Sequence, residues 1–135
     1  MSKLTIIAVL ALAAVPAIPI PSSAAESPLV QAAAAGDIAA VRALIKQGQD
    51  VNAPGQDGAT ALHWVVRADD LETVEALIKA GASVTQANAF GMTPAYIAAE
   101  NGSTSLLRRL LDAGADPNTA DRGGDTLLMA AVRTG

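Results

Sequence analysis

The chain of 135 residues contains no cysteine and only one Phe, one Trp and one Tyr. Without cysteine it has no disulfide, no thiolate nucleophile and no cysteine-ligated zinc. Apolar residues nevertheless make up 51% of the sequence, so most of that fraction is Ala, Leu, Val and Ile. Such a composition favours closely packed helices with small aliphatic side chains over a core built from a few large rings.

Basic residues are also in the minority. Nine Lys and Arg stand against 13 Asp and Glu, which gives a formal net charge of −4. A nucleic-acid partner requires a basic face that neutralises phosphates, so the charge balance argues against one. Ordinary solubility is the simplest explanation for this modest acidity.

The N-terminus has the order of a secretory signal peptide. Lys3 supplies a positive charge, Leu4–Val15 is an uncharged and mostly apolar run, and small residues precede Glu26. We expect cleavage after Ala25, or alternatively after Ala24, so that residues 1–25 form the signal peptide. The apolar run is shorter than the roughly 20 residues that cross a bilayer, which makes a retained anchor the less favoured alternative. The mature chain would then be periplasmic or secreted and have no membrane span.

A short motif recurs along the chain at a step of 33 residues. Residues 57–63 read Asp-Gly-Ala-Thr-Ala-Leu-His, residues 90–96 read Phe-Gly-Met-Thr-Pro-Ala-Tyr, and residues 123–129 read Gly-Gly-Asp-Thr-Leu-Leu-Met. Ser27–Val30 keeps the second half of the motif one step earlier. A fixed period of this size indicates a solenoid, in which each unit buries its apolar face against its neighbours.

Each unit has the pattern of two short helices. The Ser or Thr of the motif can cap the first helix, and we expect first helices at about Pro28–Ala35, Ala61–Ala68, Pro94–Glu100 and Leu127–Arg133. Second helices should follow the caps Asp37, Asp70 and Ser103 and carry apolar residues at i, i+3 and i+4. They should end at Gly48, Gly81 and Gly114. Asp69 stands at a turn between helices where glycine would adopt the backbone geometry more easily.

These residues together resemble the ankyrin repeat. The resemblance rests on Thr93-Pro94, Leu62-His63, the Leu-Leu and Leu-Ile pairs and Gly114–Asn118, and it extends from Ser27 to the C-terminus. It implies an all-α solenoid of stacked helix–turn–helix units joined by short β-hairpin links. Residues 26–135 would form one domain with a partial repeat 27–54, repeats 55–87 and 88–120, and a truncated repeat 121–135. Since the last unit lacks a second helix, we expect the natural chain to continue beyond Gly135.

The resemblance also implies a partner protein that contacts the hairpin tips and the exposed side of the first helices. The expected partner-binding residues are Gln56, Asp57, Arg67, Phe90, Met92, Glu100 and Arg122. Phe90 is the sole phenylalanine, at a tip position where the other copies have Asp57 and Gly123. Aromatic side chains often anchor interfaces, so we expect Phe90 to contact the partner. The alternative is that its ring folds onto the adjacent hairpin.

His63 is the only histidine and the one residue that suggests catalysis, as a general base beside a carboxylate such as Asp57. No nucleophile or metal-ligand partner accompanies it, so we expect hydrogen bonds between repeats instead. The aspartates at 112, 116 and 121 lack the spacing of an EF-hand loop, and Gly123-Gly124 does not continue as a phosphate loop. We therefore expect no cofactor and no metal site.

The sequence as a whole predicts an exported ankyrin-repeat protein of bacterial type that binds another protein and has no catalytic activity. One alternative is a permanent accessory or regulatory subunit of a periplasmic enzyme or stress-response system. A hydrolase that uses His63 is a further, disfavoured alternative.

Overall fold

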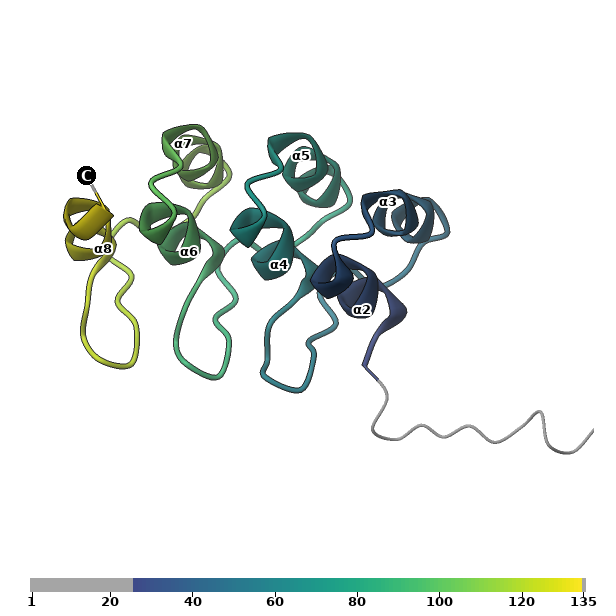
Figure 1. Cartoon of the computed structure of the whole chain (residues 1–135), viewed down its shortest axis with the longest axis horizontal. Coiled ribbons are helices and arrows are strands. Elements are labelled where there is room, and N and C mark those ends of the chain that lie inside the picture. Colours follow the sequence, from purple (N-terminus) through teal and green to yellow (C-terminus); the bar gives the residue numbers. More distant parts are fainter. Residues whose placement is uncertain (1–25, 135) are drawn as a thin grey trace, which may run out of the picture.

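The computed structural model describes residues 26–134, so the expected signal peptide, residues 1–25, lies outside the described residues. This part of the chain folds into seven helices arranged in two rows (Figure 1). The first row holds α2 (Pro28–Ala35), α4 (Ala61–Arg67), α6 (Pro94–Glu100) and α8 (Leu127–Thr134). The second row holds α3 (Ile38–Lys46), α5 (Leu71–Lys79) and α7 (Thr104–Asp112). The expected all-α solenoid is confirmed, and the ends of the first helices agree with expectation to within one residue.

Three of the four first helices begin where a Ser or Thr hydroxyl accepts a hydrogen bond from a backbone N–H of the first turn, whereas at α4 the expected Thr60 cap is absent and the His63 side chain accepts from Thr60 N instead. The observed pairs are Leu29 N to Ser27 Oγ (3.2 Å), Tyr96 N to Thr93 Oγ1 (3.3 Å) and Met129 N to Thr126 Oγ1 (3.3 Å). Pro28 and Pro94 occupy the first helical position, where the missing N–H leaves no hydrogen bond unmade. The Ser or Thr of the motif therefore precedes each first helix at the same point of the repeat, and its hydroxyl caps three of the four.

The second helices are capped less uniformly than expected. Asp37 Oδ1 accepts from Ala40 N at 3.1 Å and Asp70 Oδ1 accepts from Thr73 N at 3.2 Å, as predicted. The expectation that the Ser103 side chain caps α7 is wrong. Its hydroxyl donates instead to Asp69 Oδ1 at 2.5 Å, in the preceding repeat. The hydroxyl thus donates to the carboxylate and accepts no hydrogen bond from the first turn of α7.

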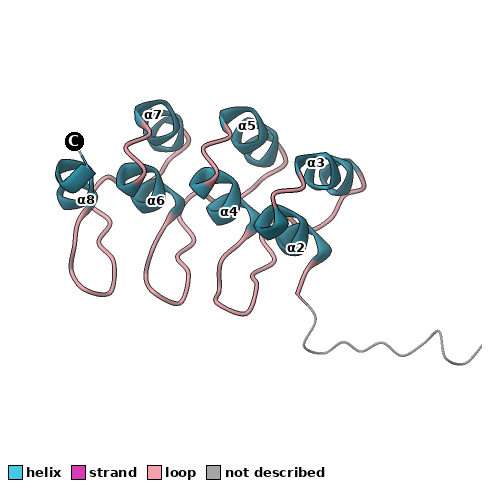
Figure 2. Cartoon of the chain, in the orientation of Figure 1, coloured by secondary structure: helices cyan, strands magenta, loops and turns pink. Residues whose placement is uncertain are grey.

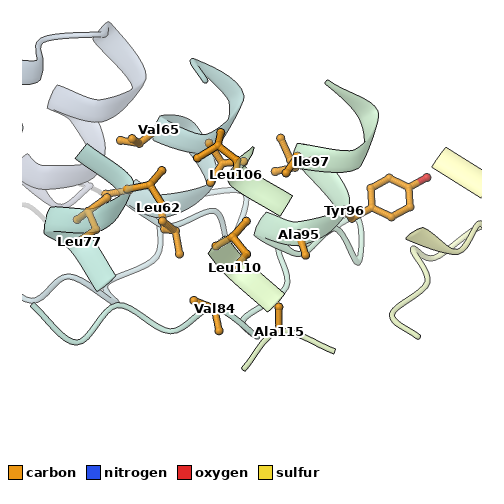
Figure 3. Packing of buried hydrophobic residues seen from close by; sticks show 14 of the residues in the cluster. Leu62, Val65, Leu77, Val84, Ala95, Tyr96, Ile97, Leu106, Leu110 and Ala115 are labelled. Atoms are coloured by element: carbon orange, nitrogen blue, oxygen red, sulfur yellow. The ribbon is translucent and has the colours of Figure 1, made fainter. Parts of the chain in front are cut away.

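One continuous core joins the repeats. Its members are aliphatic side chains from both rows, among them Leu62 of α4, Leu77 of α5, Ile97 of α6, and Leu106 and Leu110 of α7 (Figure 3). All of these are 2% exposed or less. Because the core has no break between repeats, each unit depends on its neighbours for burial of its apolar face.

One apolar face of α8 is exposed to solvent within the described residues. Leu128 and Val132 are each 72% exposed, whereas Ala95 and Ala99, which are 33 residues earlier, are 1% and 2% exposed. In the earlier repeats a second helix packs on the first, as α7 packs on α6. No second helix follows α8 within residues 26–134, so the apolar positions of α8 remain on the surface.

The links between repeats are loops, which corrects the expected β-hairpins (Figure 2). Among residues 26–134 the only β pairing is a single antiparallel bridge between Ala120 and Thr126. Each link still reverses direction, and a backbone hydrogen bond across the turn recurs in all three: Gly55 N to Ala59 O (2.8 Å), Asn88 N to Met92 O (3.0 Å) and Asp121 N to Asp125 O (2.9 Å). We call these turns tip 1 (55–59), tip 2 (88–92) and tip 3 (121–125).

None of the helices in residues 26–134 combines enough length with enough apolar character to cross a membrane.

Candidate interaction surface

Hydrogen bonds join each tip to the next. Asp57 O accepts from Ala89 N at 2.7 Å, and one repeat later Phe90 O accepts from Arg122 N at 3.2 Å. The approach is so close that a Cβ at Gly91 would lie 2.8 Å from Arg122 N, and Gly91 also has a positive φ of 80°. Only glycine fits such a position without displacing the neighbouring backbone. The three tips therefore form a row with fixed spacing along one side of the first helices (Figure 1).

The Glu26 carboxylate ends this row on the N-terminal side. Gln56 is the equivalent, in tip 1, of Ala89 and Arg122, and its N–H donates to Glu26 Oε1 at 3.0 Å. The Gln31 side chain donates to the Glu26 carbonyl at 3.1 Å and so helps to hold this residue. Glu26 takes the place of the carbonyl that a preceding tip would supply. The repeat pattern contains no signal for this role, because the contact depends on how the chain enters the first helix.

A hollow of about 150 Å³ lies between tips 1 and 2. It is lined by Asp57, Ala59, His63, Trp64, Arg67, Asn88, Phe90, Met92 and Ile97. Four of the seven residues predicted to bind a partner meet here: Asp57, Arg67, Phe90 and Met92. Asn88 and Ile97 were not predicted from the sequence as contact residues. Asn88 could have been predicted, because it is the first residue of the tip that contains Phe90.

Phe90 and Trp64 are the two aromatic residues of this lining. The Phe90 side chain is 61% exposed, so its ring is not packed away beneath the neighbouring tip. Trp64 is half-buried, and the Arg67 guanidinium lies 5.7 Å from the centre of its ring. This distance allows a cation–π interaction, which orients Arg67 along the edge of the hollow.

His63 forms part of the hollow wall and joins two repeats. It is 2% exposed. Its Nδ1 accepts from Thr60 N at 3.0 Å and its Nε2 donates to Met92 O at 3.1 Å, so we assign the proton to Nε2. Burial lowers the pKa of His63 below its ordinary value of 6.5, and this effect outweighs the opposing hydrogen bond to Met92. The predicted hydrogen bonding between repeats is confirmed, and it leaves neither ring nitrogen available as a general base.

The other three predicted contact residues lie away from the hollow. Gln56 is exposed on tip 1, Arg122 is exposed on tip 3, and Glu100 is half-buried at the end of α6. Gln56 and Arg122 use their backbone N–H groups in the row of tips, which leaves their side chains free to reach outward. Their roles in binding stay predictions.

Tip 3 is held by Tyr96, which stands at the position that His63 has one repeat earlier. Its buried ring extends toward the last repeat (Figure 3), and its hydroxyl donates to Asp121 Oδ2 at 3.4 Å. Burial raises the pKa of Tyr96, with the Asp121 carboxylate adding to the effect. Asp121 Oδ1 accepts from Gly123 N (2.8 Å) and Asp125 N (2.9 Å), so this carboxylate organises the turn. In the part of the chain that the structure describes, no three acidic or histidine side chains converge as metal ligands.

A model of the ankyrin-repeat family, described as ankyrin repeats in three copies, matches residues 8–88 and 71–135. The two matches cover nearly the whole sequence, and the chain belongs to the ankyrin-repeat family. Ankyrin repeats are generally protein-interaction modules and are typically non-catalytic. A comparison with curated protein sequences gives no match.

Proposed function

We propose that this protein is a non-catalytic module that binds another protein outside the cytoplasm, through its tips and the adjoining side of the first helices. The observation that carries the proposal is Phe90, a large apolar side chain that is 61% exposed on a tip with fixed geometry. Both neighbouring tips hold tip 2 by backbone hydrogen bonds. Its aromatic ring is therefore presented on a rigid support rather than on a mobile loop.

The physical argument rests on the cost of ordering an interface. Association must offset the entropy lost when loops and side chains become fixed, and a surface that is already ordered loses less. Aromatic and arginine side chains dominate the energetics of most interfaces. The tips supply Phe90 and Arg122, and the adjoining helix supplies Arg67, so the surface contains residues of the type that interfaces favour.

Export is supported by the N-terminal sequence. Cleavage after Ala25 would remove Lys3 alone among the charged residues and leave eight basic and 13 acidic residues. The mature chain would then begin with Glu26, the residue that ends the row of tips. N-terminal sequencing of protein recovered from the periplasm or the medium of a bacterial host tests this proposal. Retention of Met1 in a membrane fraction would contradict it.

Affinity capture from a periplasmic extract tests the binding function. The purified protein serves as bait beside a Phe90→Asp variant and a control variant, Leu71→Asp. Leu71 is a suitable control because it is an exposed apolar residue, 40% exposed, on α5 of the second row. We expect the control to retain a captured protein that Phe90→Asp loses, with both variants equally helical by circular dichroism. Equal capture by all three baits would contradict binding at the tips.

A permanent subunit of a larger assembly is a second candidate, and the exposed apolar residues of α8 favour it. Leu128, Met129 and Val132 are exposed on α8, and an apolar hollow lined by Leu107, Leu111, Pro117, Leu127, Leu128 and Ala131 adjoins them. Contiguous exposed apolar groups of this kind mark interaction sites or aggregation-prone surfaces. The two candidates differ in the behaviour of the isolated protein. A permanent subunit should aggregate alone and become monodisperse with its partner, whereas a reversible module should be monodisperse without one.

A further inference from the structure

The hollow between tips 1 and 2 has a mainly apolar lining. Ala59, Trp64, Phe90, Met92 and Ile97 supply its apolar lining, with tip 2 on one side and α4 on the other. Binding pockets of this composition take apolar groups and use a few polar groups at the edge to orient them.

Several polar atoms of this lining already have partners in the protein, whereas the Trp64 Nε1–H is buried without one among the described residues. Both ring nitrogens of His63 are hydrogen bonded to Thr60 and Met92. Asn88 Oδ1 accepts from Phe90 N (2.9 Å) and Met92 N (3.0 Å), and Asp57 Oδ1 accepts from Ala59 N (3.0 Å). These atoms are therefore not available to a polar side chain that enters the hollow and loses its water there. An apolar side chain would have no such cost.

The size of the hollow limits the occupant. A volume of about 150 Å³ is comparable with that of an apolar protein cavity that holds benzene, which is also about 150 Å³. It accommodates one leucine- or phenylalanine-sized side chain and excludes the whole apolar face of a helix. An extended segment, which can direct a single side chain inward, fits this limit best.

Arg67 gives the edge of the hollow a positive charge that no carboxylate in the described residues neutralises. The ion pairs within residues 26–134 join Arg42 to Glu72, Arg109 to Glu75 and Arg133 to Asp125. Arg67 is exposed, and its guanidinium lies over the Trp64 ring, where its N–H groups remain free for a carboxylate. The Asp57 carboxylate could compete with a partner's carboxylate for Arg67. Asp57 is half-buried, however, and one of its oxygens accepts a hydrogen bond within its own turn.

We propose that this hollow is a socket for one large apolar side chain of an extended peptide segment, with an acidic residue next to that side chain in contact with Arg67. The inference rests on the proposed function and specifies the chemistry of the partner. The formal net charge of the chain is −4. Recognition of the acidic residue therefore depends on the local contact with Arg67 rather than on long-range attraction.

A phage-displayed library of random linear peptides, selected on the purified protein, tests this specificity. We expect enrichment of Leu, Phe or Met with Asp or Glu beside it. An Arg67→Glu variant should keep the apolar preference and change the neighbouring preference to Lys or Arg. A Phe90→Ala variant should weaken the apolar preference. Enrichment of peptides without an apolar anchor, an acidic preference that survives Arg67→Glu, or no enrichment would overturn the proposal.

Trp64 provides a direct measurement, because it is the only tryptophan and belongs to the lining. The best enriched peptide should change its fluorescence on titration. Replacing the acidic residue of that peptide with Gln should weaken binding about three- to fivefold, as expected for an exposed ion pair. Replacing the apolar residue with Ser should weaken it at least as much. An unchanged dissociation constant in both cases contradicts the socket.

The capture experiment distinguishes this inference from the broader function. If a natural partner is lost with Phe90→Asp but retained with Arg67→Glu at equal affinity, the tips bind the partner and the acidic specificity is wrong. If both variants retain the partner, binding through this surface is wrong as well.

Discussion

The Ser103 hydroxyl donates a 2.5 Å hydrogen bond to the Asp69 carboxylate, across the boundary between two repeats. Asp69 is the only non-glycine residue with a positive φ among residues 26–134, at 59°. At the equivalent turns the chain has Gly36 and Gly102. The hydrogen bond therefore compensates part of the cost of a left-handed backbone at a residue with a side chain.

Replacing Asp69 with Ala should lower the free energy of unfolding by about 0.5–1.5 kcal/mol, because Ala keeps the left-handed cost and removes the acceptor of an exposed hydrogen bond. Asp69→Gly should be less destabilising, since it loses the same hydrogen bond but relieves the backbone. Urea unfolding of the two variants and of Ser103→Ala measures the contributions of the hydrogen bond and of the backbone strain. Equal stability of the Ala and Gly variants would show that backbone strain has no part in the effect.

The same substitution at two equivalent positions should have very different costs. Leu62 is fully buried in the core and Leu128, two repeats later, is 72% exposed. Leu62→Ala should cost about 2–5 kcal/mol because it leaves a cavity. Leu128→Ala should stay within about 0.5 kcal/mol, as expected for a surface position. A large loss of stability with Leu128→Ala would show that α8 is covered in solution.

Stability should decrease as the pH falls below about 6.5, because folding favours the neutral form of His63. Its pKa is lowered mainly by burial, with Asp57 acting in the opposite direction and Arg67 in the same one. The unfolded state then binds more protons, so the contribution of His63 is complete above its ordinary pKa of 6.5 and is lost below it. Thermal unfolding between about pH 7.5 and 5 measures the slope. A His63→Gln variant should be less stable and show a flatter profile, and an unchanged slope would exclude His63 as its source.

The two ion pairs of the second row should contribute unequally. Arg109 Nε lies 2.5 Å from Glu75 Oε1, and the two side chains are 29% and 34% exposed. Arg42 and Glu72 are 3.2 Å apart, and the Glu72 side chain is 79% exposed. Glu75→Gln should therefore lower the melting temperature more than Glu72→Gln. The difference should shrink in about 1 M salt, which screens exposed charges. A larger effect of Glu72→Gln would contradict this ranking.

Loss of the Glu26 side chain should free one specific backbone amide. The Gln56 N–H donates to the Glu26 carboxylate, whereas Ala89 and Arg122 donate to backbone carbonyls. In Glu26→Ala the amide of Gln56 should exchange with solvent faster, while those of Ala89 and Arg122 stay unchanged. Glu26→Gln retains an acceptor oxygen and should show a smaller effect. Hydrogen exchange measured by NMR reports all three amides, and an unchanged Gln56 rate would exclude Glu26 as its partner.

The helices and the family could be predicted from the sequence because the interactions that start and end each helix are local. A Thr hydroxyl, a Pro at the first helical position and a Gly beyond the last turn act within a few residues of each other. Their repetition at 33 residues indicated the stack before any contact was known. The same reasoning failed at Ser103, where the partner of the hydroxyl comes from the preceding repeat.

The sequence by itself determined the class of fold, the place of each helix and the position of Phe90 on a tip. Only the tertiary structure decided that Phe90, Trp64 and Arg67 surround one hollow, and that Glu26 ends the row of tips. The physical reason is distance along the chain. Phe90 is 26 residues from Trp64, and Glu26 is 30 residues from Gln56. Contacts of this kind depend on how neighbouring units stack, and the spacing within one unit does not specify them.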